Sequence, residues 1–284
     1  MNLQNASKSI KPKGAPYSVP DWAYSVEKGE GAPVILIHGL AASLYDWEML
    51  MPELATAGYH SYALDLLGHG DSPKPEERSY KLKWVLRHLE RWIDSLALTE
   101  SPVIIGHSLG GYLTLRYALR HPERARALVL VDPFYRLDQL SYILRTTYRR
   151  PTLNALIMEH LPAWVFQIAV DFTSQALGRI GDGIQYLPEE IRFQTALDYK
   201  RTHPGAFNIP NTVHDLTSKL PQIKQPTLVV WGTHDQTLRP DSFPPLVEAL
   251  PNSQSYTLKA GHVPHQSHPA EFNCVVIDFL NSLQ

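Results

Sequence analysis

The sequence predicts an α/β fold with a mostly parallel, doubly wound sheet. Short apolar runs typical of buried strands alternate with longer segments whose apolar residues have helical spacing. The alternation stops near Phe134 and resumes near Thr227, and no convincing strand is found between them. The length of 284 residues accommodates one large domain of this class.

The predicted strands are the short, strongly apolar segments. An edge strand is expected at 23–26, followed by buried strands at 33–37, 59–64, 103–105, 127–131, 227–231 and 253–258. The longer segments between them are predicted to be helices. These are 45–57, a helix capped by Ser79 with helical spacing from Leu82 to Leu96, 240–250, and a last helix after Pro269.

One long segment interrupts the alternation. Helices are expected within it near 137–149, 152–159, 162–177 and 188–202. The segment follows a strand at the edge where the carboxyl ends of parallel strands collect, and sites in such sheets form at that edge. We therefore predict that 134–219 is a helical cap over a core formed by 15–133 and 220–284. Residues 1–14 are polar and are expected to be a mobile N-terminal segment.

The stretch Gly106-His107-Ser108-Leu109-Gly110 has the pattern G-x-S-x-G between a predicted strand and a predicted helix. In so tight a turn the central residue is strained, and its neighbours two positions away must be glycine because the chain passes close to itself. The turn exposes the serine hydroxyl at the carboxyl edge of the sheet. The free N–H groups of the following helix can then stabilise an oxyanion.

A serine nucleophile needs a base, and the base needs an orienting carboxylate. His262 follows the last predicted strand, and Asp235 follows the strand before it. The chain order Ser108, Asp235, His262 is the order that accompanies this type of elbow. Asp132 also ends a strand and is the alternative acid.

These motifs resemble those of the α/β-hydrolase fold family, in particular a capped, esterase-like member with a serine nucleophile. The matching segments are Ile37-His38-Gly39, Gly68-His69-Gly70-Asp71-Ser72, Gly106 to Gly111, Trp231 to Asp235 and Ala260-Gly261-His262. The resemblance implies this fold, with the cap inserted after the sixth strand. It also implies that Ser108 is the nucleophile, that His262 is the general base and then acid, and that Asp235 orients His262.

The same resemblance implies the oxyanion hole, and the residues themselves suggest further roles. The oxyanion hole would consist of the backbone N–H groups of Leu40 and Leu109, and His38 would brace the oxyanion loop. His107 is the variable residue of the elbow and a candidate for lining the substrate pocket. Trp164 and Phe166, in an apolar part of the cap, are candidates for an apolar pocket wall.

The expected activity is hydrolysis of small to medium, largely apolar carboxylic esters through an acyl-enzyme. One alternative is a C–C bond hydrolase of ring-fission products. Members of the family with that activity carry a tryptophan directly after the catalytic histidine and a glycine-rich oxyanion loop. Here Val263 follows His262, and Leu40-Ala41-Ala42, without glycine, follows Gly39, so this alternative is disfavoured. Perhydrolase activity is a second alternative, and a ligand-binding receptor with residual hydrolysis is the alternative that is not an enzyme.

The reaction requires no cofactor. His262, His265 and His268 have the spacing H-x-x-H-x-x-H, but Pro264 and Pro269 interrupt any single helix face, so no metal site is expected. The net charge of −2 does not indicate a nucleic-acid partner, and the expected partner is a small-molecule ester. Oligomeric state is left open.

The cellular location is expected to be cytoplasmic. The polar start has no apolar signal region, and no apolar run approaches the ~18 residues of a membrane span. The single cysteine, Cys274, excludes an internal disulfide and fits a reducing compartment.

Overall fold

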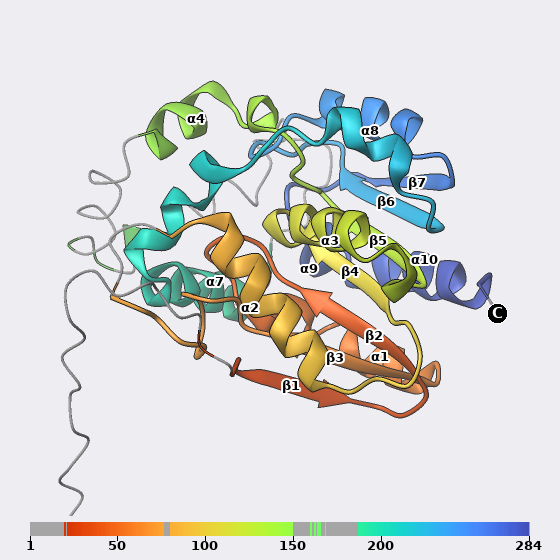
Figure 1. The fold of residues 1–284 in the computed structure, drawn as a ribbon. Helices are drawn as coiled ribbons and strands as arrows, with labels where there is room; N and C mark the ends of the chain where they lie inside the picture. Colours follow the sequence, from red (N-terminus) through yellow and green to blue (C-terminus); the bar gives the residue numbers. More distant parts are fainter. Residues whose placement is uncertain are drawn as a thin grey trace, which may run out of the picture.

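The computed structural model describes residues 20, 22–76, 80–149 and 187–283, together with positions 160, 162, 164, 165 and 168. Its centre is a seven-stranded sheet with the order β1-β3-β2-β4-β5-β6-β7 (Figure 1). Only β1 is antiparallel to its neighbour. The strands are β1 (Ser25–Lys28), β2 (Ala32–Ile37), β3 (Tyr59–Leu64), β4 (Val103–His107), β5 (Ala127–Val131), β6 (Thr227–Gly232) and β7 (Ser253–Leu258).

Helices cover both faces of the sheet, because successive strand side chains point to opposite sides. Along β2, Ile35 and Ile37 pack into one core and Val34 and Leu36 into the other. The first core also contains side chains of α2 (Leu82–Ser95), α3 (Leu109–Arg120) and α8 (Phe243–Ala249). The second contains those of α1 (Met51–Thr56) and α10 (Pro269–Asn281) (Figure 1). The predicted α/β class is confirmed.

The predicted strands agree with the structure to within two residues, but the predicted helix at 45–57 is wrong as one element. The structure has a 3₁₀ turn, η1 (Leu44–Trp47), and then α1. Pro52 lies in the first turn of α1. Because proline has no N–H, a continuous helix would lose the bond from position 52 to position 48.

The start of α2 also differs from the prediction. Its N-cap residue is Lys81, and the N–H of Leu82 donates to the hydroxyl of Thr212 at 2.8 Å. Ser79, the predicted cap, lies outside the described residues. The first turn is therefore capped by a residue that is distant in the chain.

The inserted segment, residues 134–219, follows β5. Five strands precede it among the described residues, so its predicted position after a sixth strand is wrong by one. Its described elements are η3 (Leu137–Gln139), α4 (Tyr142–Tyr148), α7 (Glu189–Arg201), η4 (Pro204–Thr212) and the first residues of η5 (Thr217–Gln222). The predicted helices near 137–149 and 188–202 correspond to η3 with α4 and to α7. The prediction at 152–159 and most of that at 162–177 lie outside the described residues.

The chain after β6 contains the remaining short helices. The predicted helix at 240–250 is η6 (Pro240–Ser242) followed by α8. A one-turn helix, α9 (Pro264–Ser267), precedes α10 and was not predicted. In the described part of the chain, no helix has both the length and the apolar character needed to cross a membrane.

Candidate active site

The turn between β4 and α3 holds Ser108 in an unusual backbone conformation. Its φ is 50° and its ψ is −111°, which costs on the order of 1–3 kcal/mol for a residue with a side chain. A Cβ atom at Gly106 would lie 2.4 Å from the carbonyl oxygen of Gly110, and one at Gly110 would lie 2.1 Å from that of Ile37. The turn therefore excludes side chains at both flanking positions, as the motif predicted.

The loops after β6 and β7 bring an imidazole and a carboxylate to this turn. His262 Nε2 lies 3.0 Å from Ser108 Oγ, and His262 Nδ1 lies 2.7 Å from Asp235 Oδ2. A carboxylate accepts hydrogen bonds, so Nδ1 carries the proton and the lone pair of Nε2 faces the serine hydroxyl. This arrangement can accept the serine proton while the carboxylate stabilises the imidazolium that forms.

The second oxygen of Asp235 is held by the backbone. Its Oδ1 accepts from the N–H groups of Thr237 at 2.7 Å and Leu238 at 3.0 Å. The carboxylate is buried, and its side chain is fully inaccessible. Because one oxygen is fixed by two amides, the other has a defined direction toward His262.

Asp132, the alternative acid, is close but differently engaged. Its Oδ1 accepts from the N–H of Gly232 at 3.0 Å. Burial, followed by the charge of neighbouring Asp235, raises the pKa of Asp132 well above its usual range. A carboxyl group that retains its proton cannot stabilise a nearby imidazolium by charge. The hydrogen bond of His262 Nδ1 to Asp235 Oδ2 therefore favours Asp235 as the acid.

The N–H groups of Leu40 and Leu109 are both free to bind a ligand. Leu109 is the first residue of α3 and so has no partner within the helix. Neither N–H donates to an acceptor within the described parts of the chain. A Cβ atom on Gly39 would lie 3.3 Å from that of Ser108, which brings the Gly39–Leu40 peptide beside the nucleophile.

His38 fixes the orientation of that peptide. Its Nε2 accepts from the N–H of Leu66 at 2.9 Å, so Nδ1 carries the proton and donates to the carbonyl of Gly39 at 2.7 Å. Burial lowers the pKa of His38, which favours this neutral form. The carbonyl and N–H of a trans peptide point in opposite directions, so the N–H of Leu40 points away from His38.

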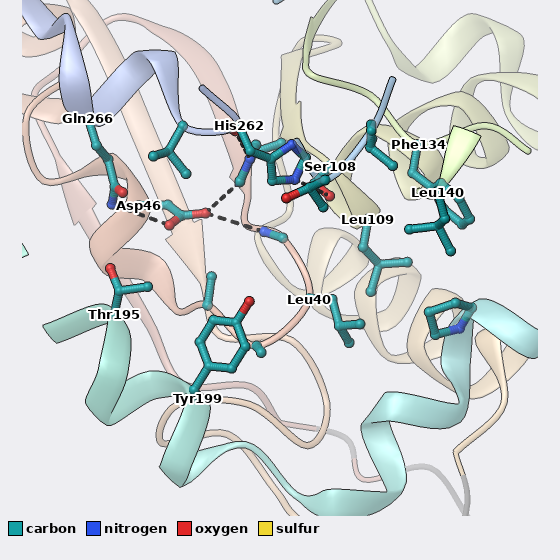
Figure 2. A pocket seen from close by; sticks show the side chains of 18 of the residues that line it. Leu40, Asp46, Ser108, Leu109, Phe134, Leu140, Thr195, Tyr199, His262 and Gln266 are labelled. Carbon is teal, nitrogen blue, oxygen red and sulfur yellow. Dashed lines mark hydrogen bonds and ion pairs between the residues drawn. The ribbon is translucent and has the colours of Figure 1, made fainter. Parts of the chain in front are cut away.

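A pocket opens above Ser108 and has two chemically different sides. Figure 2 shows Leu109, Phe134 and Leu140 on one side of Ser108 and Asp46, Thr195 and Gln266 on the other. Part of the lining comes from the inserted segment, namely Phe134, Leu140, Leu187, Thr195, Tyr199 and Pro210.

The predicted pocket residues have three different outcomes. His107 does line the pocket, although both of its ring nitrogens are engaged by other groups. Trp164 is 61% exposed and is absent from the described lining, so the structure does not bring it to Ser108. Phe166 lies outside the described residues. The apolar wall instead contains Phe134 and Leu140, which periodicity alone could not relate to Ser108.

The three histidines of the H-x-x-H-x-x-H pattern separate into different environments. His262 contacts Ser108, His265 lies in a buried cluster with Asp46, and His268 bonds to the hydroxyl of Ser267. The segment turns through α9 between them. Over the described ranges, these three side chains do not gather around one point.

Comparisons with known proteins give a consistent family. The sequence model of the alpha/beta hydrolase fold matches residues 32–156. The pimeloyl-[acyl-carrier protein] methyl ester esterase of Aeromonas hydrophila is 30% identical over 264 residues, covering 90% of this chain and 98% of that esterase. The 2-hydroxy-6-oxononadienedioate/2-hydroxy-6-oxononatrienedioate hydrolase 2 of Pseudomonas putida is 29% identical over 273 residues, covering 89% of each chain.

Solved structures show the same architecture. A thermophilic esterase from Thermogutta terrifontis superimposes with a TM-score of 0.77 at 22% identity, covering 92% of this chain and 93% of that one. The chain therefore belongs to the α/β-hydrolase fold family, as its motifs predicted. The names of its relatives support a hydrolytic enzyme.

Proposed function

We propose that this hydrolase is a serine carboxylesterase in which Ser108 is the nucleophile, His262 the general base and acid, and Asp235 the orienting carboxylate. The observation that carries the proposal is the position of the His262 ring, with one nitrogen 3.0 Å from Ser108 Oγ and the other 2.7 Å from Asp235 Oδ2. This is the geometry that activates a serine hydroxyl.

Acylation follows from this arrangement. Ser108 Oγ attacks the ester carbonyl carbon while His262 Nε2 takes its proton. The carbonyl oxygen becomes an oxyanion, which the N–H groups of Leu40 and Leu109 stabilise. The C–O bond to the alcohol then breaks, and His262 returns the proton to the leaving alkoxide.

Deacylation repeats the same steps with water. His262 takes a proton from a water molecule, which attacks the acyl carbon of the ester on Ser108. The second oxyanion collapses, Ser108 leaves with the proton from His262, and the carboxylic acid is released. No electron transfer or cofactor is needed.

The lining of the pocket supports a neutral, largely apolar ester of small to medium size. Its described part contains six leucine and phenylalanine side chains and no lysine or arginine: Leu40, Leu109, Phe134, Leu140, Leu187 and Leu238. A dianionic dienedioate would lack a cationic partner there. The C–C hydrolase alternative therefore has less support, whereas perhydrolysis uses the same groups and stays a possible side reaction.

We also propose that residues 134–219 act as a cap, with 15–133 and 220–284 forming the catalytic core. Leu187, Thr195, Tyr199 and Pro210 of this segment line the same pocket as Ser108. Their identity would set the acyl and alcohol preferences.

Hydrolysis of p-nitrophenyl esters from acetate to octanoate tests the proposal. Wild type is expected to turn over these esters, and Ser108→Ala to fall to the uncatalysed rate. Ser255→Ala, at an exposed position on β7, is the matched control and should be as active as wild type. Background rates in wild type would contradict the proposal, and a fast burst followed by stalled turnover would favour the receptor alternative.

A further inference from the structure

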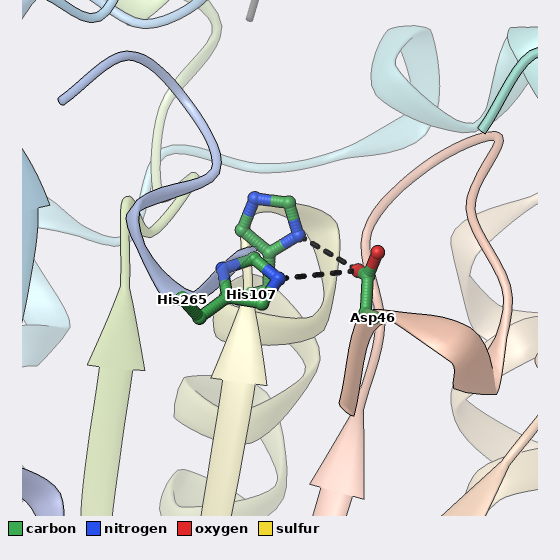
Figure 3. Close-up of side chains that lie close together, drawn as sticks. All are labelled: Asp46, His107 and His265. Carbon is green, nitrogen blue, oxygen red and sulfur yellow. Dashed lines mark hydrogen bonds and ion pairs between the residues drawn. The ribbon is translucent and has the colours of Figure 1, made fainter. Parts of the chain in front are cut away.

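A second aspartate–histidine pair lies next to the candidate nucleophile, because His107 directly precedes Ser108 in the chain. Asp46 lies in η1, His107 ends β4 and His265 lies in α9, and Figure 3 shows the three side chains together. All three are buried. The proposed hydrolysis does not use any of them.

His107 lies between two hydrogen-bond partners. Nδ1 lies 2.9 Å from Asp46 Oδ2, and Nε2 lies 2.9 Å from the backbone carbonyl oxygen of His262. Burial raises the pKa of Asp46, but the hydrogen bond from His107 is the largest of the opposing effects, which together hold that pKa well below its usual range. The carboxylate and the carbonyl are both acceptors, so each ring nitrogen of His107 faces an acceptor.

The pair reaches the catalytic groups from two directions. His107 donates to the carbonyl of His262, the residue whose ring faces Ser108. Asp46 Oδ2 accepts from the N–H of Gly39 at 3.3 Å, and Gly39 precedes Leu40 in the oxyanion loop. The Asp46–His107 pair thus contacts both the backbone of the base and the backbone of the oxyanion loop.

His265 packs against this pair but does not hydrogen-bond to it. Its ring centroid lies 4.6 Å from that of His107, and its Nε2 lies 4.0 Å from Asp46 Oδ2. Burial, followed by the charge of His107, lowers its pKa to about 3. Neither ring nitrogen has a hydrogen-bond partner among the described residues. His265 is therefore neutral, and its ring packs against that of His107.

From these contacts we propose that Asp46 and His107 are positioning residues. They hold the backbones of His262 and of the Gly39–Leu40 loop in a fixed position relative to Ser108. The inference rests on the esterase proposed above. A hydrogen bond at each junction limits the movement of the base relative to the oxyanion hole. Misplacement of reacting groups by ~1 Å costs about 100-fold in rate.

The experiment measures the rate at which a fluorophosphonate labels Ser108, followed by kcat and KM on p-nitrophenyl butyrate. Asp46→Asn should slow labelling about 10- to 100-fold and lower kcat similarly, with KM within about threefold. His265→Phe is the matched control, because it keeps the buried aromatic volume and because neither ring nitrogen of His265 hydrogen-bonds to His262 or Gly39. It should label at close to the wild-type rate.

Two further variants separate positioning from general destabilisation. In His107→Gln the amide nitrogen can occupy the place of Nε2 and donate to His262, whereas in His107→Asn it can occupy only the place of Nδ1. The glutamine variant should therefore retain more activity than the asparagine variant. This comparison holds even where Asp46→Asn does not fold.

The outcomes are distinguishable. Wild type without labelling at Ser108 would overturn the esterase proposal and this inference with it. Wild-type labelling combined with unchanged rates in folded Asp46→Asn, or with equal rates in the two His107 variants, would overturn the inference alone. One equivalent of a divalent metal in wild type that is lost in His265→Phe would also overturn it, because the three side chains would then be ligands.

Discussion

The two aspartate–histidine pairs of this molecule differ in what the second ring nitrogen faces. In both pairs Nδ1 lies within 3 Å of a buried carboxylate. His262 Nε2 faces a serine hydroxyl, which can give up a proton, whereas His107 Nε2 faces a backbone carbonyl, which has none. The same two residue types can therefore support proton transfer in one place and only orientation in the other.

The largest loss of activity is expected on removal of the His262 imidazole, the one that faces the serine hydroxyl. His262→Ala should lower kcat by ~10⁴-fold or more, because His262 is the base that hydrogen-bonds to Ser108 Oγ in the described part of the chain. Steady-state hydrolysis of p-nitrophenyl butyrate measures this effect. His234→Ala is the control, since His234 lies in the exposed loop next to Asp235. A loss below tenfold in His262→Ala would contradict the assignment of proton transfer to His262.

The acids of the site give the next largest difference. Asp235→Asn should lower kcat by about 10³–10⁴-fold, because an amide cannot stabilise the imidazolium and can favour the wrong tautomer. Asp132→Asn should lower it by less than about tenfold, since Asp132 is expected to be protonated and its bond from Gly232 survives the change. The reverse order would assign the acid role to Asp132.

The second pair should also have a characteristic dependence of stability on pH. The pKa of Asp46 in the folded protein lies below its ordinary value of 3.8. Its ionised carboxylate therefore stabilises the folded state above about pH 4, and this stabilisation is lost as the pH falls through the folded pKa. Asp46→Asn should lower the free energy of unfolding by about 1.5–3 kcal/mol at pH 7. Urea titrations at pH 7 and at the lowest pH where the protein folds would test whether the difference shrinks.

Asp198 gives the opposite and smaller effect, because it has no imidazole partner in the described structure. Burial, opposed by the hydrogen bond from Ser43, raises the pKa of Asp198 to about 7. Folding then favours the protonated form, and stability falls as the pH rises toward and through 7. Asp198→Asn should raise Tm by roughly 2–4 °C at pH 8 and have little effect at pH 5. Equal Tm shifts at pH 5 and pH 8 would contradict this prediction.

The sheet and the three proposed catalytic residues could be predicted from the sequence because their signals are local. Each strand is a short apolar run, and Ser108, Asp235 and His262 each follow such a run in a fixed order. The carboxyl ends of parallel strands then bring the three side chains to one edge without further information.

The Asp46–His107 pair could not be predicted, because its contacts join residues far apart in the chain. Asp46 lies 61 positions from His107, and the capping of α2 by Thr212 spans 130 positions. No spacing rule relates such residues. Pro52 was a local signal that the prediction of one helix at 45–57 overlooked.

The central claim is that Ser108 is activated by His262, and intact-protein mass after exposure to a fluorophosphonate tests it most directly. The account predicts one added label in wild type, mapped to Ser108, and loss of that label in both Ser108→Ala and His262→Ala. Folded wild type that stays unlabelled, or a label that persists in His262→Ala at the wild-type rate, would contradict it.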